Sequence, residues 1–203
     1  MSQGKTVVID YQAGNLNSVC KALRAVGADV EVTAEPNGLL NAARIVLPGV
    51  GHFSSTGCLL TSSIGDALRK RVAEGIPFLG ICVGLQWLFA GSTEAMETPG
   101  LGVFPDLCER FSLSVKSPHV GWNSLEATGK SRLLEGLDPS PYVYYTHSYR
   151  APRINATTAV TNYGGEFSAI IELDNWMAVQ FHPEKSGAIG LKILENFLKV
   201  ASC

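Results

Sequence analysis

The chain has 203 residues, a formal net charge of −2 at pH 7 and a sequence pI near 6.1. This length suits one domain with a core of fair size, and the near-balanced charge gives no electrostatic reason to expect a nucleic-acid partner. No apolar run approaches the length that spans a bilayer, and the start of the chain carries no signal-peptide pattern. We therefore expect residues 1–203 to form a single soluble, cytoplasmic domain with no membrane partner.

Strand and helix patterns alternate through the first part of the chain. Short apolar strands are expected at Thr6–Asp10, Asp29–Thr33 and Ala43–Leu47, and helices from about Asn15 to Val26 and over Thr56–Glu74. Such alternation predicts an α/β fold with a mainly parallel, doubly wound sheet and helices on both faces. Ligands bind at the carboxyl ends of the strands in sheets of this kind.

Glycine-containing turns follow the first and third of these strands. Gly14–Ser18 has a plain interpretation as a helix cap. Pro48–Gly51 is either a flexible turn or a loop whose glycines let backbone N–H groups converge on one point. Both turns are expected at the edge of the sheet where a ligand would bind.

The sequence around Cys82 predicts a strand over Ile76–Cys82, a sharp turn, and a helix over Val83–Ala90. Gly80 and Gly84 lie two residues on either side of the cysteine, as in the G-x-S-x-G elbow that exposes a nucleophile. The dipole of the following helix would favour the reactive thiolate. The alternative is a small buried cysteine with a packing role.

The five cysteines of the chain, at positions 20, 58, 82, 108 and 203, include no C-x-x-C pair. This spacing predicts neither a disulfide framework nor a zinc site. We expect four of them to be packing residues and one to carry chemistry.

After the elbow, the pattern changes to short strands with frequent Gly and Pro over Gly102–Tyr163, apart from a brief helix near Ser131–Gly136. We expect a smaller, partly antiparallel strand extension beside the main sheet. Trp122 is either a core aromatic or an exposed interface anchor, and His119 and His147 are expected to be structural.

The segment Trp176–Lys185 indicates another buried strand, with His182 and Glu184 at its carboxyl end. Side chains two residues apart in an extended segment point the same way, and Pro183 favours an extended His182. Imidazole and carboxylate could then act as base and orienting group for a nucleophile. A lone histidine here would more simply be structural, but an elbow cysteine elsewhere in the chain favours catalysis. A helix over Gly187–Val200 closes the chain.

Two of these motifs resemble those of a known family. Gly80-Ile-Cys-Val-Gly-Leu-Gln86 and Phe181-His-Pro-Glu184 are similar to the motifs of the class I glutamine amidotransferases, whose glutaminase domains use a Cys-His-Glu triad. Pro48-Gly-Val-Gly-His-Phe53, Pro118-His-Val-Gly-Trp-Asn123 and Thr146-His-Ser-Tyr149 narrow the resemblance to the glutaminase subunits of imidazole glycerol phosphate synthase. The motifs occur in the family's order and cover essentially the whole chain.

The resemblance implies a role for each motif. Cys82, His182 and Glu184 would form the catalytic triad, with no metal and no cofactor. The oxyanion hole would use the Val83 N–H and an N–H near Val50 or Gly51, after a peptide flip that Gly51 makes sterically easy. The positions that would bind the substrate are Gly49, Gln86, Glu94, Ser148 and Tyr149. The positions that would face a partner subunit are Asn15, Trp122, Tyr144 and Lys185.

The reaction implied is hydrolysis of L-glutamine to glutamate and ammonia. The sequence shows no phosphate-binding loop, no dinucleotide fingerprint and no second domain for an acceptor, so the ammonia would pass to a separate subunit. The resemblance implies a (β/α)8-barrel cyclase that forms imidazole glycerol phosphate and aminoimidazole carboxamide ribotide in histidine biosynthesis. The alternatives are a glutaminase of guanylate or anthranilate type, a thiol hydrolase with the same triad and no partner, and a non-catalytic interaction module.

Overall fold

The computed structural model describes residues 4–12 and 14–200, and within them the main sheet has eight strands. In spatial order these are β2 (Val30–Thr33), β1 (Thr6–Ile9), β3 (Arg44–Gly49), β4 (Phe78–Cys82), β13 (Trp176–Val179), β12 (Glu166–Leu173), β11 (Thr157–Asn162) and β8 (Glu126–Ala127). The first five run parallel, and the last three continue the sheet in antiparallel orientation. The predicted α/β class with a mainly parallel sheet is confirmed.

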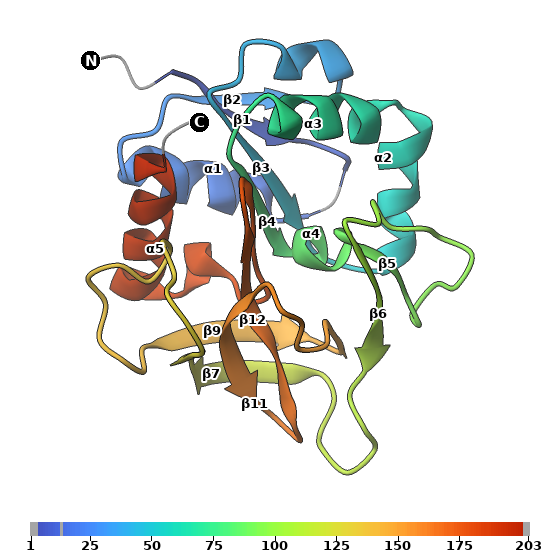
Figure 1. Cartoon of the computed structure of the whole chain (residues 1–203), viewed down its shortest axis with the longest axis vertical. Coiled ribbons are helices and arrows are strands. Elements are labelled where there is room, and N and C mark those ends of the chain that lie inside the picture. Colours follow the sequence, from blue (N-terminus) through green and yellow to red (C-terminus); the bar gives the residue numbers. More distant parts are fainter. Residues whose placement is uncertain (1–3, 13, 201–203) are drawn as a thin grey trace.

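Helices cover both faces of this sheet (Figure 1). The longer ones are α1 (Leu16–Ala25), α2 (Gly57–Thr61), α3 (Ile64–Ala73) and α5 (Gly187–Lys199), and the short 3-10 helices are η1 (Pro36–Leu39), η2 (Phe53–Thr56) and η3 (Pro183–Lys185). Successive strand side chains point to opposite faces, so Val8 and Leu79 join the core under α1 and α5. Val7 and Phe78 join the core under α2 and α3. The doubly wound arrangement is therefore confirmed.

The predicted helix over Thr56–Glu74 is wrong as a single element. Its first residue ends η2, and α2 is then closed by a hydrogen bond from the Ser62 N–H to the Cys58 carbonyl. Ser63 has a left-handed backbone with φ of 60°, which breaks the helical path before α3 begins.

The predicted helix over Val83–Ala90 is wrong beyond its first turn. α4 (Val83–Gln86) is a single turn, and the chain then enters a strand at Phe89. Every side chain from position 83 to 89 is buried, so no polar face remains that a longer surface helix could turn to water.

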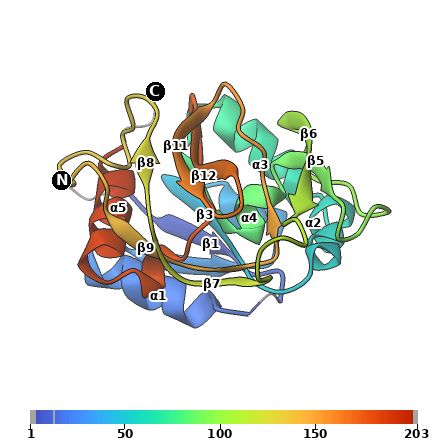
Figure 2. The same ribbon diagram turned by 90° about the horizontal axis from the view of Figure 1, so that it is seen from below.

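Short strands dominate the region after α4, as expected. They form two small sheets: β10 (Tyr149–Arg150), β6 (Phe104–Arg110) and β5 (Phe89–Ser92) in one, and β7 (His119–Ser124) with β9 (Tyr142–His147) in the other. The β7 and β9 strands pair antiparallel and lie side by side in both views (Figure 2). The carboxyl ends of β3 and β4 point toward this β7–β9 ribbon (Figure 1).

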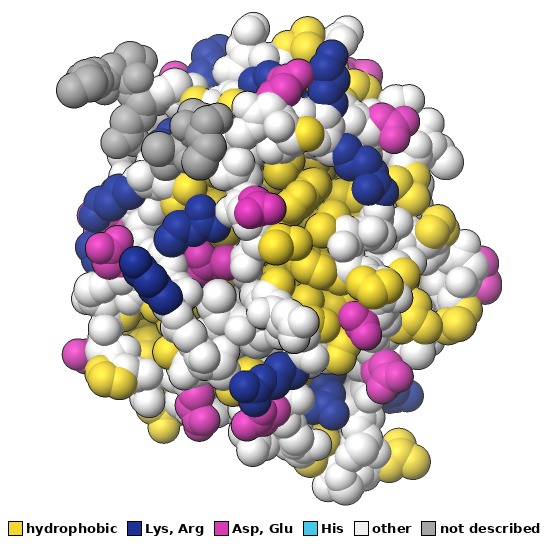
Figure 3. Space-filling view, viewed as in Figure 1, with side chains coloured by type: hydrophobic (Ala, Val, Ile, Leu, Met, Phe, Trp, Pro, Cys, Tyr) yellow, Lys and Arg dark blue, Asp and Glu magenta, His cyan; other side chains and the backbone are white. Residues whose placement is uncertain are grey.

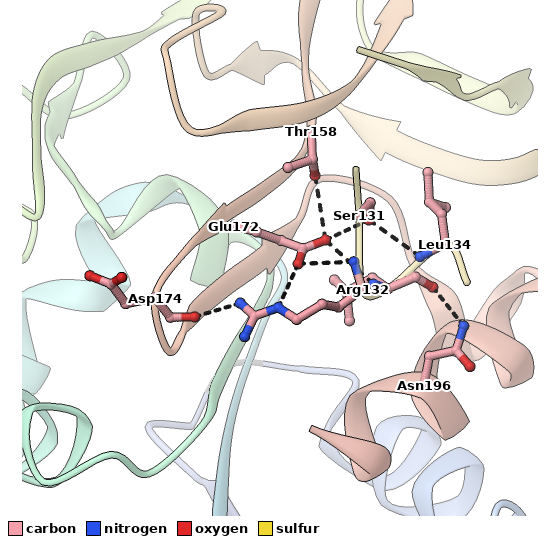
Figure 4. Close-up of polar contacts among 8 residues, drawn as sticks. Ser131, Arg132, Leu134, Thr158, Glu172, Asp174 and Asn196 are labelled. Atoms are coloured by element: carbon pink, nitrogen blue, oxygen red, sulfur yellow. Dashed lines mark hydrogen bonds and ion pairs between the residues drawn. The ribbon is translucent and has the colours of Figure 1, made fainter. Parts of the chain in front are cut away.

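The brief helix expected near Ser131–Gly136 is wrong. The segment forms turns that are tied to Glu172 of β12 (Figure 4). The Glu172 carboxylate accepts from the backbone N–H of Arg132 at 3.2 Å and from its Nε at 3.0 Å, while Asn196 of α5 donates to the Leu133 carbonyl. Because these backbone groups bond to side chains, the segment is held without a helical turn.

Basic and acidic side chains are interspersed around a central apolar area on the face shown in Figure 3. Among the helices of the described residues, none is both long enough and apolar enough to cross a membrane.

Candidate active site

Four neighbouring parallel strands end at one edge of the main sheet, and a candidate residue lies at or after the carboxyl end of each. Asn15 lies after β1, Gly49 ends β3, Cys82 ends β4, and His182 follows β13. The register pairs Gly49 with Cys82 across β3 and β4. Residues that are far apart in the sequence are thereby brought to one place, as the alternating pattern predicts.

Cys82 lies on a sharp elbow between β4 and α4. Its φ of 55° and ψ of −106° are sparsely populated for a residue with a side chain, and such strain occurs mainly where packing enforces it. A Cβ at Gly80 would lie 2.5 Å from the Gly84 oxygen, and one at Gly84 would lie 2.1 Å from the Leu47 oxygen. The two glycines thus permit the close approach that the elbow requires. Because α4 is one turn long, the dipole that acts on the thiol is smaller than that of the longer helix expected.

Replacing Gly84 by alanine is expected to lower the free energy of unfolding by about 1–3 kcal/mol, because the new Cβ must displace the Leu47 carbonyl or the elbow. If Cys82 is the expected nucleophile, a shift of its sulfur by about 1 Å would also reduce turnover roughly 100-fold. Urea denaturation and a turnover assay measure the two effects. Gly129→Ala is the matched control, since an added Cβ there meets no atom within 4 Å. A stable and fully active Gly84→Ala variant would contradict the need for this close approach.

His182 and Glu184 form a fully buried pair. His182 Nδ1 lies 2.7 Å from Glu184 Oε1, and both side chains are inaccessible to solvent. His182 is extended, as expected, but Glu184 belongs to η3, so the expectation of a continuous extended segment is wrong and a tight turn brings the carboxylate to the ring. The Asn15 side-chain amide donates to the same carboxylate oxygen. The carboxylate is therefore held from two sides.

Burial disfavours a charged imidazole at His182, but the Cys82 sulfur and the Glu184 carboxylate outweigh this effect and raise the pKa of His182 to about 10. Cys82 acts on the ring through its charge and as a hydrogen-bond acceptor. The contact is looser than a well-aligned hydrogen bond, since His182 Nε2 has no partner at full hydrogen-bonding geometry in the described part of the chain. Contacts of this kind often tighten only when substrate binds.

Cys82 opens into a cavity of about 490 Å³, a size typical of small-molecule sites. The other predicted site residues that line it are Asn15, Val50, Gly51, Val83, Gln86, Glu94, Ser148, Tyr149 and Lys185. Five predicted site residues are not in the cavity wall: Gly49, Trp122, Tyr144 and the buried pair His182 and Glu184. Gly49 is the last residue of β3, and an added Cβ there would lie 2.4 Å from the Tyr11 hydroxyl.

Hydrogen bonds inside the protein fix two of the cavity side chains. Gln86 Nε2 donates to the Tyr149 carbonyl at 2.8 Å, and Glu94 Oε2 accepts from the Phe53 N–H at 2.8 Å. His147, expected to be structural, also reaches the cavity wall, and its Nδ1 lies 2.9 Å from the same Tyr149 carbonyl. Burial lowers the pKa of His147 to about 3, so this ring is neutral at physiological pH.

One buried polar residue beside Cys82 was missed by the sequence analysis. Gln180 follows β13 and is fully buried, and its Nε2 lies 3.7 Å from Cys82 Sγ. The available signal was a polar residue inside the otherwise apolar run Met177-Ala-Val-Gln-Phe181.

Among the residues that the structure describes, no group of three or more His, Cys, Asp or Glu side chains is placed to hold a metal ion.

Two predicted partner-facing aromatics lie on the outer side of the β7–β9 ribbon. Trp122 is 55% exposed and pairs across the ribbon with Tyr144, at 6.1 Å between ring centroids. Lys185 Nζ lies 5.9 Å from the centre of the Tyr144 ring. Since Lys185 also lines the cavity, the ribbon surface and the mouth of the cavity adjoin.

Comparison with known proteins gives the class to which the chain belongs. Residues 7–201 match the family model described as glutamine amidotransferase class-I. A solved structure described as that of a glutamine amidotransferase has the same fold, with a TM-score of 0.75 and 23% identity over 96% of this chain and 99% of that one. The molecule is thus an enzyme of the glutamine amidotransferase class.

The relatives narrow this class. Imidazole glycerol phosphate synthase subunit HisH of Aquifex aeolicus is 46% identical over 201 residues, which cover 97% of each chain. Subunit HisH 1 of Methanococcus maripaludis is 41% identical over 199 residues, covering 95% of this chain and 98% of the relative. This chain belongs to the HisH family of class-I glutamine amidotransferases.

Proposed function

We propose that this chain, as a single domain, is the glutaminase subunit of an imidazole glycerol phosphate synthase. It would hydrolyse L-glutamine through a triad of Cys82, His182 and Glu184. The observation that carries this proposal is the strained elbow that places the Cys82 sulfur at a cavity, next to a buried imidazole that a carboxylate orients. Nucleophile, base and orienting group then stand in the order that acyl transfer requires.

In the reaction, the Cys82 thiolate attacks the side-chain carboxamide carbon of glutamine. The Val83 N–H and an N–H near Val50 or Gly51 stabilise the oxyanion, each worth about 3–4 kcal/mol in the transition state. His182 gives a proton to the departing nitrogen, so ammonia leaves and a glutamyl thioester remains. His182 then takes a proton from water, which attacks the thioester and releases glutamate.

The cavity wall offers groups that suit the amino-acid end of glutamine. The Glu94 carboxylate is a suitable partner for the α-ammonium group. Gln86, Ser148 and Tyr149 supply amide, hydroxyl and backbone groups for the remaining polar atoms. Gly49 would act beside them by leaving room for Tyr11 and Val83 to pack closely against the end of β3.

The ammonia must reach an acceptor before water protonates it, which favours a partner that covers the cavity. The HisH relatives are named as subunits of a synthase, and a (β/α)8-barrel cyclase is the partner that we propose. It would use the ammonia to form imidazole glycerol phosphate and aminoimidazole carboxamide ribotide in the cytoplasm. Trp122, Tyr144, Lys185 and the cavity-wall residue Asn15 would face this subunit.

A glutaminase assay with and without the cyclase subunit tests the proposal. We expect slow hydrolysis by the free chain and faster hydrolysis when the cyclase and its ligand are present.

Lys185→Glu should weaken this stimulation more than it weakens glutamine binding, because the charge lies beside the ribbon surface and the cavity mouth. Lys70→Glu on α3, which covers a face of the sheet away from this edge, is the control. A free chain that ignores glutamine but cleaves esters or peptides would instead support a thiol hydrolase.

A further inference from the structure

Gln180 lies beside the sulfur of Cys82 because of the register between β13 and β4. Val179 pairs with Ile81, so the next residue of each strand reaches the same level at the carboxyl edge of the sheet. The Gln180 side chain is fully buried, and its Nε2 is 3.7 Å from Cys82 Sγ. The buried amide is therefore directed at the sulfur of Cys82.

The orientation of the Gln180 amide follows from two successive hydrogen bonds, which link it through Gln86 to the Tyr149 backbone carbonyl. The Tyr149 carbonyl can only accept, so the Gln86 group at 2.8 Å from it must be the NH2. The same Gln86 NH2 lies 3.3 Å from a Gln180 side-chain atom, which must then be the oxygen. The NH2 of Gln180 is left to face Cys82. The network therefore has one direction, and it delivers a donor to the sulfur.

We propose that Gln180 is a further catalytic residue, which donates an amide hydrogen bond to the Cys82 sulfur and so stabilises and orients the thiolate. This inference rests on the proposed function, in which that thiolate is the nucleophile. A hydrogen bond to an anion is stronger than one to a neutral acceptor, so the donor favours the thiolate over the thiol. His182 exchanges protons with the reacting groups on one side of the sulfur. On another side, the Gln180 hydrogen bond stabilises the negative charge of the thiolate.

The test is alkylation of Cys82 by iodoacetamide as a function of pH in the full chain, followed on the Cys82 peptide by mass spectrometry. Iodoacetamide reacts with the thiolate, and its carboxamide resembles the end of a glutamine side chain. Gln180→Met keeps an unbranched side chain but removes the donor, and should move the midpoint of the profile upward by about one pH unit, equal to a tenfold loss of rate below the midpoint. Gln180→Glu should move it further, because its carboxylate opposes a second negative charge. Superimposed profiles for wild type and Gln180→Met would overturn the proposal.

Asn196→Leu is the matched control for the loss of a buried amide. Asn196 is buried in α5 and donates to the Leu133 and Glu135 carbonyls, away from the cavity. It should lower stability and leave the alkylation midpoint unchanged. If only a structural role were lost in Gln180→Met, that variant would behave like Asn196→Leu.

A measurement on the unmodified protein covers the case in which the Gln180 variants do not fold. The side-chain NH2 resonance of Gln180 should shift with pH at the same midpoint as the alkylation rate, because its acceptor changes from thiol to thiolate. A resonance that does not respond in that range would refute the proposal. The failure of the Gln180 proposal can be told apart from the failure of the proposed function. If the chain is not a glutaminase, the wild-type protein leaves glutamine intact, whatever the alkylation profiles show. If only the Gln180 proposal is wrong, the wild-type protein hydrolyses glutamine and the alkylation profiles superimpose.

Discussion

Cys82→Ala is expected to abolish glutamine hydrolysis while the partner subunit continues to work with added ammonia. Removal of the nucleophile from a hydrolase triad typically costs about 10⁶-fold in turnover, because binding and oxyanion donors alone give little rate. Alanine keeps a Cβ, so the strained φ of 55° at this position is unchanged and the elbow keeps its shape. Glutamate release and ammonia-driven product formation, measured on the same complex, separate the two activities.

Cys58→Ala is the matched control for that experiment. The expectation that Cys58 is a packing residue is wrong, because its side chain is exposed in α2. No residue of α2 lines the cavity, and the Cys58 thiol donates to the Ser55 carbonyl. Both activities should survive its removal. Loss of both activities in Cys82→Ala would mean that the cysteine supports the complex rather than the chemistry, and retained hydrolysis would remove it from the triad.

The meeting of Cys82 and His182 could be predicted because their placement depends on local sequence and on one general property of parallel sheets. Gly80 and Gly84 are visible as letters on either side of Cys82, and the structure shows that each is needed where another backbone approaches. His182 follows a recognisable buried strand, β13, and parallel strands bring their carboxyl ends to one edge. Sequence patterns therefore sufficed to bring Cys82 and His182 to the same edge of the sheet.

The elements that could not be predicted are those decided by distant parts of the chain. The apolar run after Cys82 is compatible with a helix or a strand, and burial on all sides ends the helix after one turn. The segment near Ser131 has a helical sequence pattern, but the backbone N–H of Arg132 donates a hydrogen bond to the carboxylate of Glu172, 40 residues away. Gln180 becomes a neighbour of Cys82 only through the register of β13 against β4. None of these causes can be seen in a local window of sequence.

Glu184→Gln is expected to reduce glutamine hydrolysis by about 10³- to 10⁴-fold without unfolding the protein. The carboxylate oxygen Oε1 accepts from both His182 Nδ1 and the Asn15 amide, so the glutamine oxygen should take that place. The shape of the site would persist, but the negative charge that stabilises the imidazolium would be lost. The new NH2 would occupy the position of Oε2, which is buried and has no partner in the described part of the chain. We expect this to cost about 1–3 kcal/mol of stability.

The same substitution gives a pH-dependent signature that separates orientation from charge. Glu184 is one of the two anionic groups that raise the pKa of His182 to about 10, so its loss should move the imidazole titration, followed by NMR, to lower pH. Wild-type imidazole should stay protonated until the pH approaches 10. The variant imidazole should lose its proton at a lower pH, because the Glu184 carboxylate no longer offsets the lowering of the pKa by burial. Glu195→Gln, which removes a surface carboxylate paired with Lys199, should change neither turnover nor this titration. If Glu184→Gln kept near wild-type turnover and an unmoved His182 titration, the carboxylate would be a packing group, and the proposed triad would reduce to a cysteine and a histidine.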